Sequence, residues 1–520
     1  MKSRLVPTLV VVPGVALFLL SVVIPATALL VRSVSLGMTD GEAVLGQERY
    51  WLLLGRSLRL AVCGAVLSVV LSLPGAYVIG RLGRVSRRPV VGALLLAPLL
   101  LPPMVYAFGW QSAWGGSPRL VPDDLRCVWV WASWCWPIPA LLIGTGWARE
   151  GRCAFEAAVL ESSAGIAFCR AVLPVLARQA ALGGLIVLAL LIGEYSVPHA
   201  CNLVVVATSL LGRASQSSRP ADVLVPSLPV VALILTALAA AGWVWRWRSG
   251  DDTASAGASP ATTRCAVLIA VMVAVVGVTV VLPVAALAWK LESPAAMREA
   301  LATYRGELAA SVAVALAAGV ASVLMGMSLL ISGRWCGPIM MATLALGILP
   351  GALVGEGVLV AYRGVDLVYN NWPLLVIGYM ARFGWIGILT AWLATASVGP
   401  DAVAQARTDG ADQTQISLRL RYGPNTALLV TGVAVVAAMS LADIAVAALL
   451  QTPGVGPISL ILIEKFHRFE DDMLISLSLW LVAGAVPATL LGWAALRVRE
   501  IAGNDSSGRR PRRPLRVSAP

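Results

Sequence analysis

The sequence predicts an all-α polytopic membrane protein with about twelve transmembrane helices in two tandem halves. Of its 520 residues, 58% are hydrophobic and only 13% are Asp, Glu, Lys or Arg, whereas soluble domains carry about 25% charged residues. The hydrophobic residues form runs of about 20 or more, long enough to cross a hydrocarbon core of about 30 Å. Helices are expected because backbone groups in lipid must bond internally, and no alternating strand pattern appears. The clearest runs are residues 5–31, 57–80, 179–200, 265–289, 308–332 and 425–450.

The placement of the basic residues predicts the orientation in the membrane. The net charge is +12, and the basic residues gather between hydrophobic runs, as at Arg81 to Arg88, and in the tail, residues 499–520. With the N-terminus inside, the inner segments carry more Lys and Arg than the outer ones, as the positive-inside rule requires. We therefore expect a protein of the cell (inner) membrane with both termini cytoplasmic. The lipid bilayer is its expected partner, and nucleic acid is not.

An internal repeat predicts the two halves. Val22-Val23-Ile24-Pro25-Ala26 is matched by Val280-Val281-Leu282-Pro283-Val284, and Ala97-Pro98-Leu99 by Leu349-Pro350-Gly351. Residues 1–248 and 265–498 are the predicted halves, each with six helices, and residues 249–264 form a flexible cytoplasmic linker. A parallel repeat of this kind places a pathway between the halves.

Two long inner loops fall at equivalent places in the halves, at about residues 149–178 and 400–424. Long ordered loops in compact membrane proteins usually dock a partner. The first contains Glu156-Ala157-Ala158-Val159-Leu160-Glu161-Ser162-Ser163 and then Leu173-Pro174. The second contains Ala404-Gln405-Ala406-Arg407-Thr408-Asp409-Gly410-Ala411 and then Gly423-Pro424.

This pair of loops resembles the EAA motif in permease subunits of binding-protein-dependent ABC importers (type I, MetI-like fold). The resemblance covers nearly the whole chain and is strongest to the fused iron(III)-type permeases. It implies that each loop is a coupling helix seated on a cytoplasmic ABC ATPase, two copies in all, and that an extracytoplasmic solute-binding protein delivers the solute. Ser162 stands where the family has Gly, and Ala404 replaces the leading Glu. The coupling residues implied are Glu156, Ala157, Ala158, Glu161, Ser162, Asp409, Gly410 and Ala411.

Four ionisable residues within the predicted spans are candidates for a pathway or gate: Glu194, Asp443, Arg382 and Glu356. The first three match positions at which the resembled family carries an acidic residue or an Arg-Phe pair. Charges in a membrane are costly, so they face a partner or a water-filled cavity. Two interpretations stay open: a gate that receives solute, or a structural ion pair between Arg382 and one carboxylate.

Other residue types exclude several functions. The eight cysteines and the two histidines, His199 and His467, form no metal-binding pattern, and we expect no metal and no cofactor. The three lysines, Lys2, Lys290 and Lys465, lie in no phosphate-binding loop, so ATP hydrolysis is expected on a separate chain and the protein is not expected to be an enzyme. The alternatives are a twelve-helix facilitator-type secondary transporter and a lipid-modifying enzyme. The tryptophans between Trp129 and Trp136 suggest an interfacial aromatic belt.

Overall fold

The computed structural model consists of helices, and no β-strand occurs among the residues that it describes. These are residues 11–36, 39–82, 97–115, 121–216, 219–246, 266–331, 336–454, 456–468 and 470–484. The predicted linker at 249–264 and the basic tail at 499–520 lie outside them, as do the basic residues from Arg84 to Arg88. The all-α prediction is confirmed for the described part of the chain.

The chain is a multi-pass membrane protein. In its described part, eight helices are long and apolar enough to cross a membrane, or up to ten if each of two bent helix pairs is one span. The bent pairs are Asp123–Cys135 with Pro137–Gly146, and Ala342–Ile348 with Gly351–Tyr362. Two further predicted spans, the one that contains Ala97 and the one that ends before residue 499, run into residues outside the described ranges.

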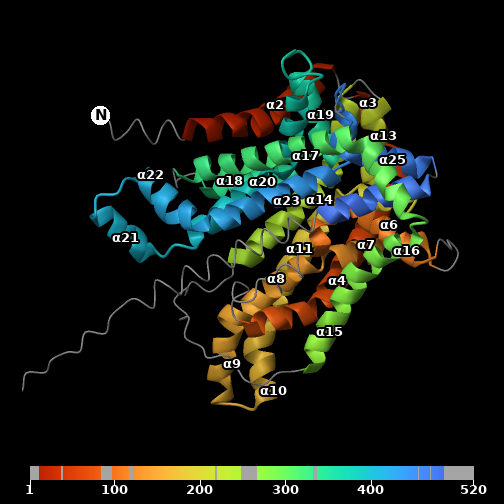
Figure 1. The fold of residues 1–520 in the computed structure, drawn as a ribbon. Helices are drawn as coiled ribbons and strands as arrows, with labels where there is room; N and C mark the ends of the chain where they lie inside the picture. Colours follow the sequence, from red (N-terminus) through yellow and green to blue (C-terminus); the bar gives the residue numbers. More distant parts are fainter. Residues whose placement is uncertain are drawn as a thin grey trace, which may run out of the picture.

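The first part of the chain ends in a long helix, α14 (Figure 1). Several spans contain short π-helical turns, labelled η. In order, the elements are η1 (Leu19–Val23), α2 (Ile24–Leu36), α3 (Thr39–Leu45), α4 (Glu48–Leu82), α6 (Pro103–Ala113), α7 (Asp123–Cys135), α8 (Pro137–Gly146), η3 (Trp147–Gly151), α9 (Arg152–Val159), α10 (Ala164–Ala167), η4 (Phe168–Val172), α11 (Leu173–Ile192), α12 (Ser196–Ala200), α13 (Val206–Gln216) and α14 (Ala221–Arg246).

The second part repeats this order of long and short helices. Its elements are α15 (Ala266–Val276), η5 (Gly277–Val281), α16 (Leu282–Lys290), α17 (Pro294–Ile331), α18 (Cys336–Ile348), α19 (Gly351–Tyr362), α20 (Trp372–Ala396), α21 (Pro400–Thr408), α22 (Gln413–Gln415), η6 (Ile416–Tyr422), the 3-10 turn η7 (Gly423–Asn425), α23 (Thr426–Ala442), α24 (Ala445–Leu449) and α25 (Ile458–His467). Residues 471–484 are also helical.

The first helix of each part packs against the other part. Helix α2 lies on α19, and α16 lies on α6. Glycines allow these close crossings: a Cβ atom at Gly109 would come within 2.8 Å of the Pro283 carbonyl oxygen, and one at Gly357 within 3.3 Å of that of Pro25. The two parts are therefore interlocked along their first helices.

A tyrosine secures each crossing. The Tyr106 hydroxyl donates to the Thr279 carbonyl, and the Tyr362 hydroxyl donates to the Leu20 carbonyl, each at 2.6 Å. Pro25 and Pro283 have no N–H, so each removes one backbone donor next to the π-helical turn that precedes it, η1 or η5. A tyrosine from the other part thus bonds to a carbonyl in each of these turns.

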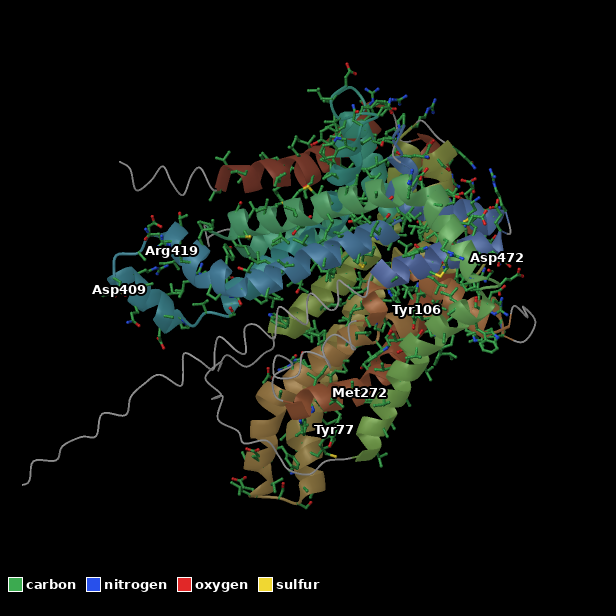
Figure 2. All side chains as sticks on the ribbon, viewed as in Figure 1. Tyr77, Tyr106, Met272, Asp409, Arg419 and Asp472 are labelled. Atoms are coloured by element: carbon green, nitrogen blue, oxygen red, sulfur yellow. The ribbon has the colours of Figure 1, made fainter. Side chains whose placement is uncertain are left out.

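The helices converge at one end of the molecule and diverge at the other (Figure 1). At the convergent end α13 packs against α19 and α24, and one apolar core joins residues of both parts, such as Val105, Ile348 and Ile458. At the divergent end α9 and α10 lie far from α21 and α22. Figure 2 shows Asp409 at the divergent end and Asp472 at the convergent end.

Candidate functional site: a charged cavity and two exposed loops

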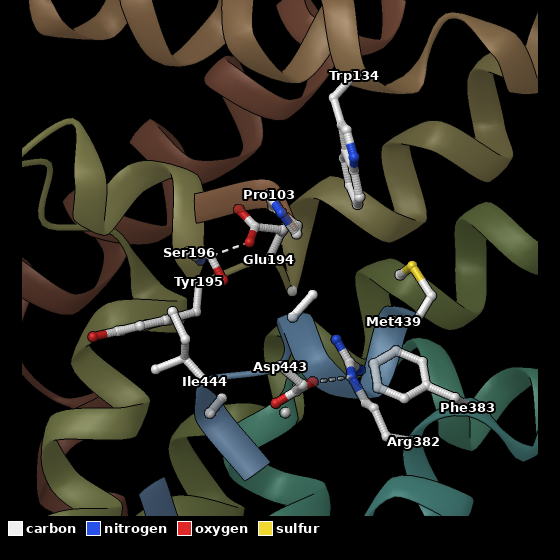
Figure 3. Close-up of a pocket in the computed structure, with 14 residues that line it drawn as sticks. Pro103, Trp134, Glu194, Tyr195, Ser196, Arg382, Phe383, Met439, Asp443 and Ile444 are labelled. Carbon is white, nitrogen blue, oxygen red and sulfur yellow. Dashed lines mark hydrogen bonds and ion pairs between the residues drawn. The ribbon is translucent and has the colours of Figure 1, made fainter. Parts of the chain in front are cut away.

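A small cavity lies where the long helices α11 and α23 end, near the middle of α20. Its volume is about 60 Å³, enough for a few water molecules. Three of the predicted gate residues line it: Glu194, Arg382 and Asp443 (Figure 3). These residues come from both parts of the chain, so the cavity lies where the two parts meet.

Glu194 caps the short helix α12. Its carboxylate accepts hydrogen bonds from the backbone N–H of Ser196 at 2.6 Å and of Val197 at 3.0 Å. The indole N–H of Trp131 on α7 donates to it at 2.9 Å. Because helix N-termini favour negative charge, this carboxylate needs no basic partner. Helix α11 ends at Ile192, so Glu194 lies just beyond the helix. From the sequence, Glu194 was expected within the span.

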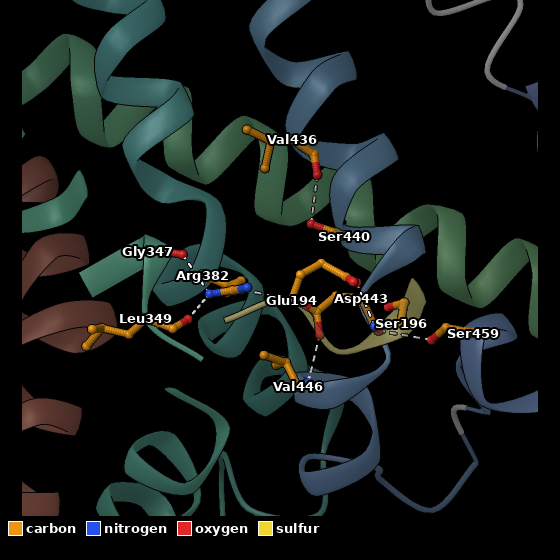
Figure 4. A network of polar contacts seen from close by, with 10 residues as sticks. All are labelled: Glu194, Ser196, Gly347, Leu349, Arg382, Val436, Ser440, Asp443, Val446 and Ser459. Carbon is orange, nitrogen blue, oxygen red and sulfur yellow. Dashed lines mark hydrogen bonds and ion pairs between the residues drawn. The ribbon is translucent and has the colours of Figure 1, made fainter. Parts of the chain in front are cut away.

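Arg382 fills the break between α18 and α19, where the chain bends by 108°. Its guanidinium donates to the carbonyls of Gly347, at 2.8 Å, and of Leu349 (Figure 4). A helix leaves its last carbonyls without internal partners, and the bend at Pro350 prevents the next turn from supplying them. The guanidinium therefore bridges a broken helix as well as facing the cavity.

Asp443 is the ionic partner of Arg382. Its Oδ2 lies 3.5 Å from Arg382 Nε, and the side chains are only 8% and 14% exposed. Its Oδ1 accepts from the Val446 N–H at 2.7 Å, which caps α24 as Glu194 caps α12. Asp443 also follows its long helix, α23, which ends at Ala442. The structure thus contains the ion pair between Arg382 and a carboxylate that one interpretation of the sequence anticipated. The same pair lines a cavity, as the gate interpretation required.

Close contacts surround the cavity. A Cβ atom at Gly193 would lie 3.3 Å from the carbonyl oxygen of Ile348, which belongs to the other part. Within the second part, a Cβ atom at Gly351 would lie 2.8 Å from Ala445 Cβ. The three charged groups carry a formal charge of −1 together, and each bonds to protein groups. In this conformation the site is a plug with little free space.

Glu356 lies apart from this cavity. It is buried on α19 and is not among the lining residues. The structure therefore brings three of the four candidate gate residues together and leaves Glu356 out.

The second predicted coupling loop ends its helix with a glycine cap. Gly410 has φ +83°, the Ala411 N–H donates to the Ala406 carbonyl, and the Gly410 N–H donates to the Arg407 carbonyl. This pair of bonds is the Schellman motif, which favours glycine because of its left-handed φ. Asp409 precedes it and is exposed. The glycine in the motif thus has a structural reason.

The first predicted coupling loop ends differently. Ser162 donates through both N–H and hydroxyl to the Ala158 carbonyl, at 3.0 and 2.8 Å. The φ angle of Ser162 is not positive, unlike that of Gly410, so a serine can stand in this turn where the resembled motif has glycine. Glu156, Ala157 and Glu161 are exposed, and Ala158 is half-buried. Both loops therefore present acidic side chains to solvent at the divergent end.

An aromatic cluster anchors the first loop to the spans. Trp147 lies 6.4 Å, between ring centroids, from Phe155 on α9 and from Phe168 on η4. Gly80 on α4 makes room for the indole, because a Cβ there would approach Trp147 Cδ1 to 2.2 Å. This anchor was not predicted from the sequence, although the aromatic residues on both sides of the loop could have indicated it.

The aromatic-belt prediction was wrong for three of the four tryptophans. Trp131, Trp134 and Trp136 are 1%, 6% and 0% exposed. Their indoles donate to Glu194, to the Leu101 carbonyl and to Thr279 Oγ1 respectively. Buried indoles need an acceptor, and here they bond across helices inside the protein. A cluster of tryptophans in the sequence does not distinguish these two roles.

Comparisons with protein-family models, with curated proteins and with solved structures find no match to this chain. The geometry of the described residues is therefore the ground for a functional proposal.

Proposed function

We propose that this chain is the membrane permease of an ABC importer, with both six-helix halves fused and about twelve spans in all. A binding protein delivers a small solute at the convergent end, and two copies of a separate ATPase bind α9–α10 and α21–α22. Both termini are cytoplasmic in this proposal. Iron(III) is the first solute to test, with the resemblance of the sequence as its support.

One observation carries the proposal: two exposed acidic loops, equivalent in sequence, stand apart at the divergent end while the opposite end is closed over a charged cavity. A transporter in an inward-open state requires this combination. The interlocked first helices support a pathway between the parts, because closure at one end is coupled to separation at the other. The caps made by Glu194 and Asp443 favour equivalent halves.

Charge reversal at both loops tests the proposal. We expect the full-length protein to co-purify with its ATPase, and Glu156→Arg with Asp409→Arg to weaken the complex about tenfold or more, because acidic side chains at such an interface pair with basic ones. The matched control is Asp366→Arg with Asp471→Arg, which makes the same change in charge at exposed positions away from the loops. The control should bind as wild type does.

Transport measurements decide against the facilitator alternative. We expect solute uptake into proteoliposomes to require ATP and the ATPase. Uptake driven by an ion gradient alone, without any ATPase bound, would contradict the importer proposal.

A further inference from the structure

The only two histidines of the chain meet at the convergent end, one from each part. The ring centroids of His199 on α12 and His467 on α25 lie 5.2 Å apart, with an interplanar angle of 87°. His199 also stacks on Tyr195 at 5.0 Å and 18°, and Tyr195 lines the charged cavity. The histidine pair is thus one residue removed from the plug.

The surroundings of the pair are aromatic. Phe466 lies 6.2 Å from the His199 ring and 5.1 Å from Phe108 on α6, by ring centroids. The Nε2 atom of His199 is buried and has no hydrogen-bond partner. Such surroundings disfavour a charged imidazole at His199, whose ring is partly buried, while the His467 side chain is exposed.

Most of the charged groups on neighbouring elements are already engaged. On α25 and just after it, Lys465 pairs with Glu470 at 2.5 Å and Arg468 pairs with Glu464 at 3.0 Å. Just before α12, Glu194 accepts the three bonds described above. On α7, which packs against α12, the charged residues are Asp123 and Arg126, which pair with each other, and Asp124, which pairs with Arg56 and Arg59. On α6, Gln111 is neutral and bonds to Ala200. On α17, Tyr304 lies under Lys465, and Glu307 lies beside Gly456 ahead of α25.

We propose that His199 and His467 form a proton-sensitive latch that holds the convergent end closed when both imidazoles are neutral and releases it when they are protonated. Two imidazolium groups in this contact repel each other, and the carboxylates of Glu194, Glu464 and Glu470 already have partners. Separation of α12 from α25 relieves the repulsion and exposes the partly buried ring of His199, whereas His467 is already exposed. This inference goes beyond the proposed transport function and does not depend on an ATPase.

The sign of the pH dependence follows from the closed state. Burial and the neighbouring His467 lower the pKa of His199, so the proton binds more tightly when the contact is open. The contact therefore contributes fully at a pH above the usual histidine value of about 6.5, and its contribution is lost as the pH falls below that value. An acidic exterior would favour opening.

Histidine-selective NMR tests the electrostatic part. Because the full-length chain has two histidines, labelled imidazoles give one resonance each. We expect His199 to titrate below free histidine, and His467→Gln to move its midpoint upward. A His199 midpoint that His467→Gln leaves unchanged would overturn the latch.

Distance measurements on the full-length protein in lipid nanodiscs test the mechanical part. Spin labels on bio-orthogonal side chains at Ser215 on α13 and at Asp471 report the separation of the parts, and both positions are exposed. We expect longer distances at about pH 5 than at about pH 8. His467→Lys should lengthen them at about pH 8, and its neutral match His467→Gln should not.

The chain without histidine, His199→Gln with His467→Gln, is the decisive variant. We expect it to fold, bind no proton at this site and give one distance distribution at both pH values. A pH-dependent distance that persists in this variant, or its absence in the wild type, would contradict the proposal. Loss of ATPase binding, by contrast, would count against the importer proposal and not against the latch.

Discussion

At the scale of single residues, the cavity is organised by carbonyls as much as by charges. Arg382 bonds to Gly347 and Leu349 at a helix break, and it is also paired with Asp443. Removing one member of a buried pair leaves the other without compensation, whereas replacing both with apolar residues is often tolerated.

This difference gives a stability prediction. Asp443→Leu should destabilise the protein by about 3 kcal/mol, because the guanidinium stays buried without its partner. Arg382→Met with Asp443→Leu should be closer to wild type than the single change. The temperature at which the detergent-solubilised protein loses its monodisperse elution peak measures both. Equal losses in the single and double variants would show that the ion pair is not what holds the two residues.

At the scale of elements, each crossing helix depends on a proline and on a tyrosine from the other part of the chain. The proline removes a backbone donor next to a π-helical turn of an apolar helix, and an unpaired carbonyl in such surroundings costs free energy. Tyr106 and Tyr362 remove that cost at two places in the molecule.

Removal of either hydroxyl should therefore destabilise the crossing. We expect Tyr106→Phe and Tyr362→Phe each to cost about 1–3 kcal/mol and to lower the unfolding temperature. Tyr369→Phe, in the partly exposed α19–α20 connection, is the control and should have little effect. If all three variants unfold alike, the crossings do not rely on these bonds.

At the scale of the whole molecule, the two parts are closed at one end and apart at the other. In the proposed cycle, ATP-bound ATPases bring α9 and α21 together and separate the convergent end. Spectroscopic labels at Leu160, which is 86% exposed, and at Asp401 report this distance. We expect it to shorten when a non-hydrolysable ATP analogue is added to the complex with the ATPase, and to stay unchanged without the ATPase. A distance that ignores the nucleotide in the complex would exclude this motion.

The sequence predicted more of the elements than of their contacts. Pro25 and Pro283 indicated related helices, because they occupy matching places in two hydrophobic runs. They could not show that α2 packs on α19 and α16 on α6, since hydrophobic periodicity carries no information about the partner. The ionisable residues Glu194, Arg382 and Asp443 were identifiable because charges in apolar runs are rare.

The supporting contacts of the cavity were not predictable. The carbonyls that Arg382 binds are exposed only by a bend at Pro350, and backbone groups have no sequence signature. Trp131 was wrongly assigned to an interfacial belt, because the sequence does not distinguish a buried tryptophan from an interfacial one. His199 and His467 are 268 residues apart (467 − 199 = 268), so only tertiary packing reveals their contact.

The crossed first helices affect how such a chain could have evolved and whether it could be divided into two separate halves. A single half made alone would lack the helix that covers α6 or α19, because that helix belongs to the other half. Two separate copies would bury the same surfaces only by exchanging these helices, as in a domain-swapped dimer. The fused chain therefore has the anatomy of a swapped dimer made permanent by a peptide linker. In the proposed cycle, the unit built on α6 would include α16 of the second half, and the unit built on α19 would include α2 of the first half.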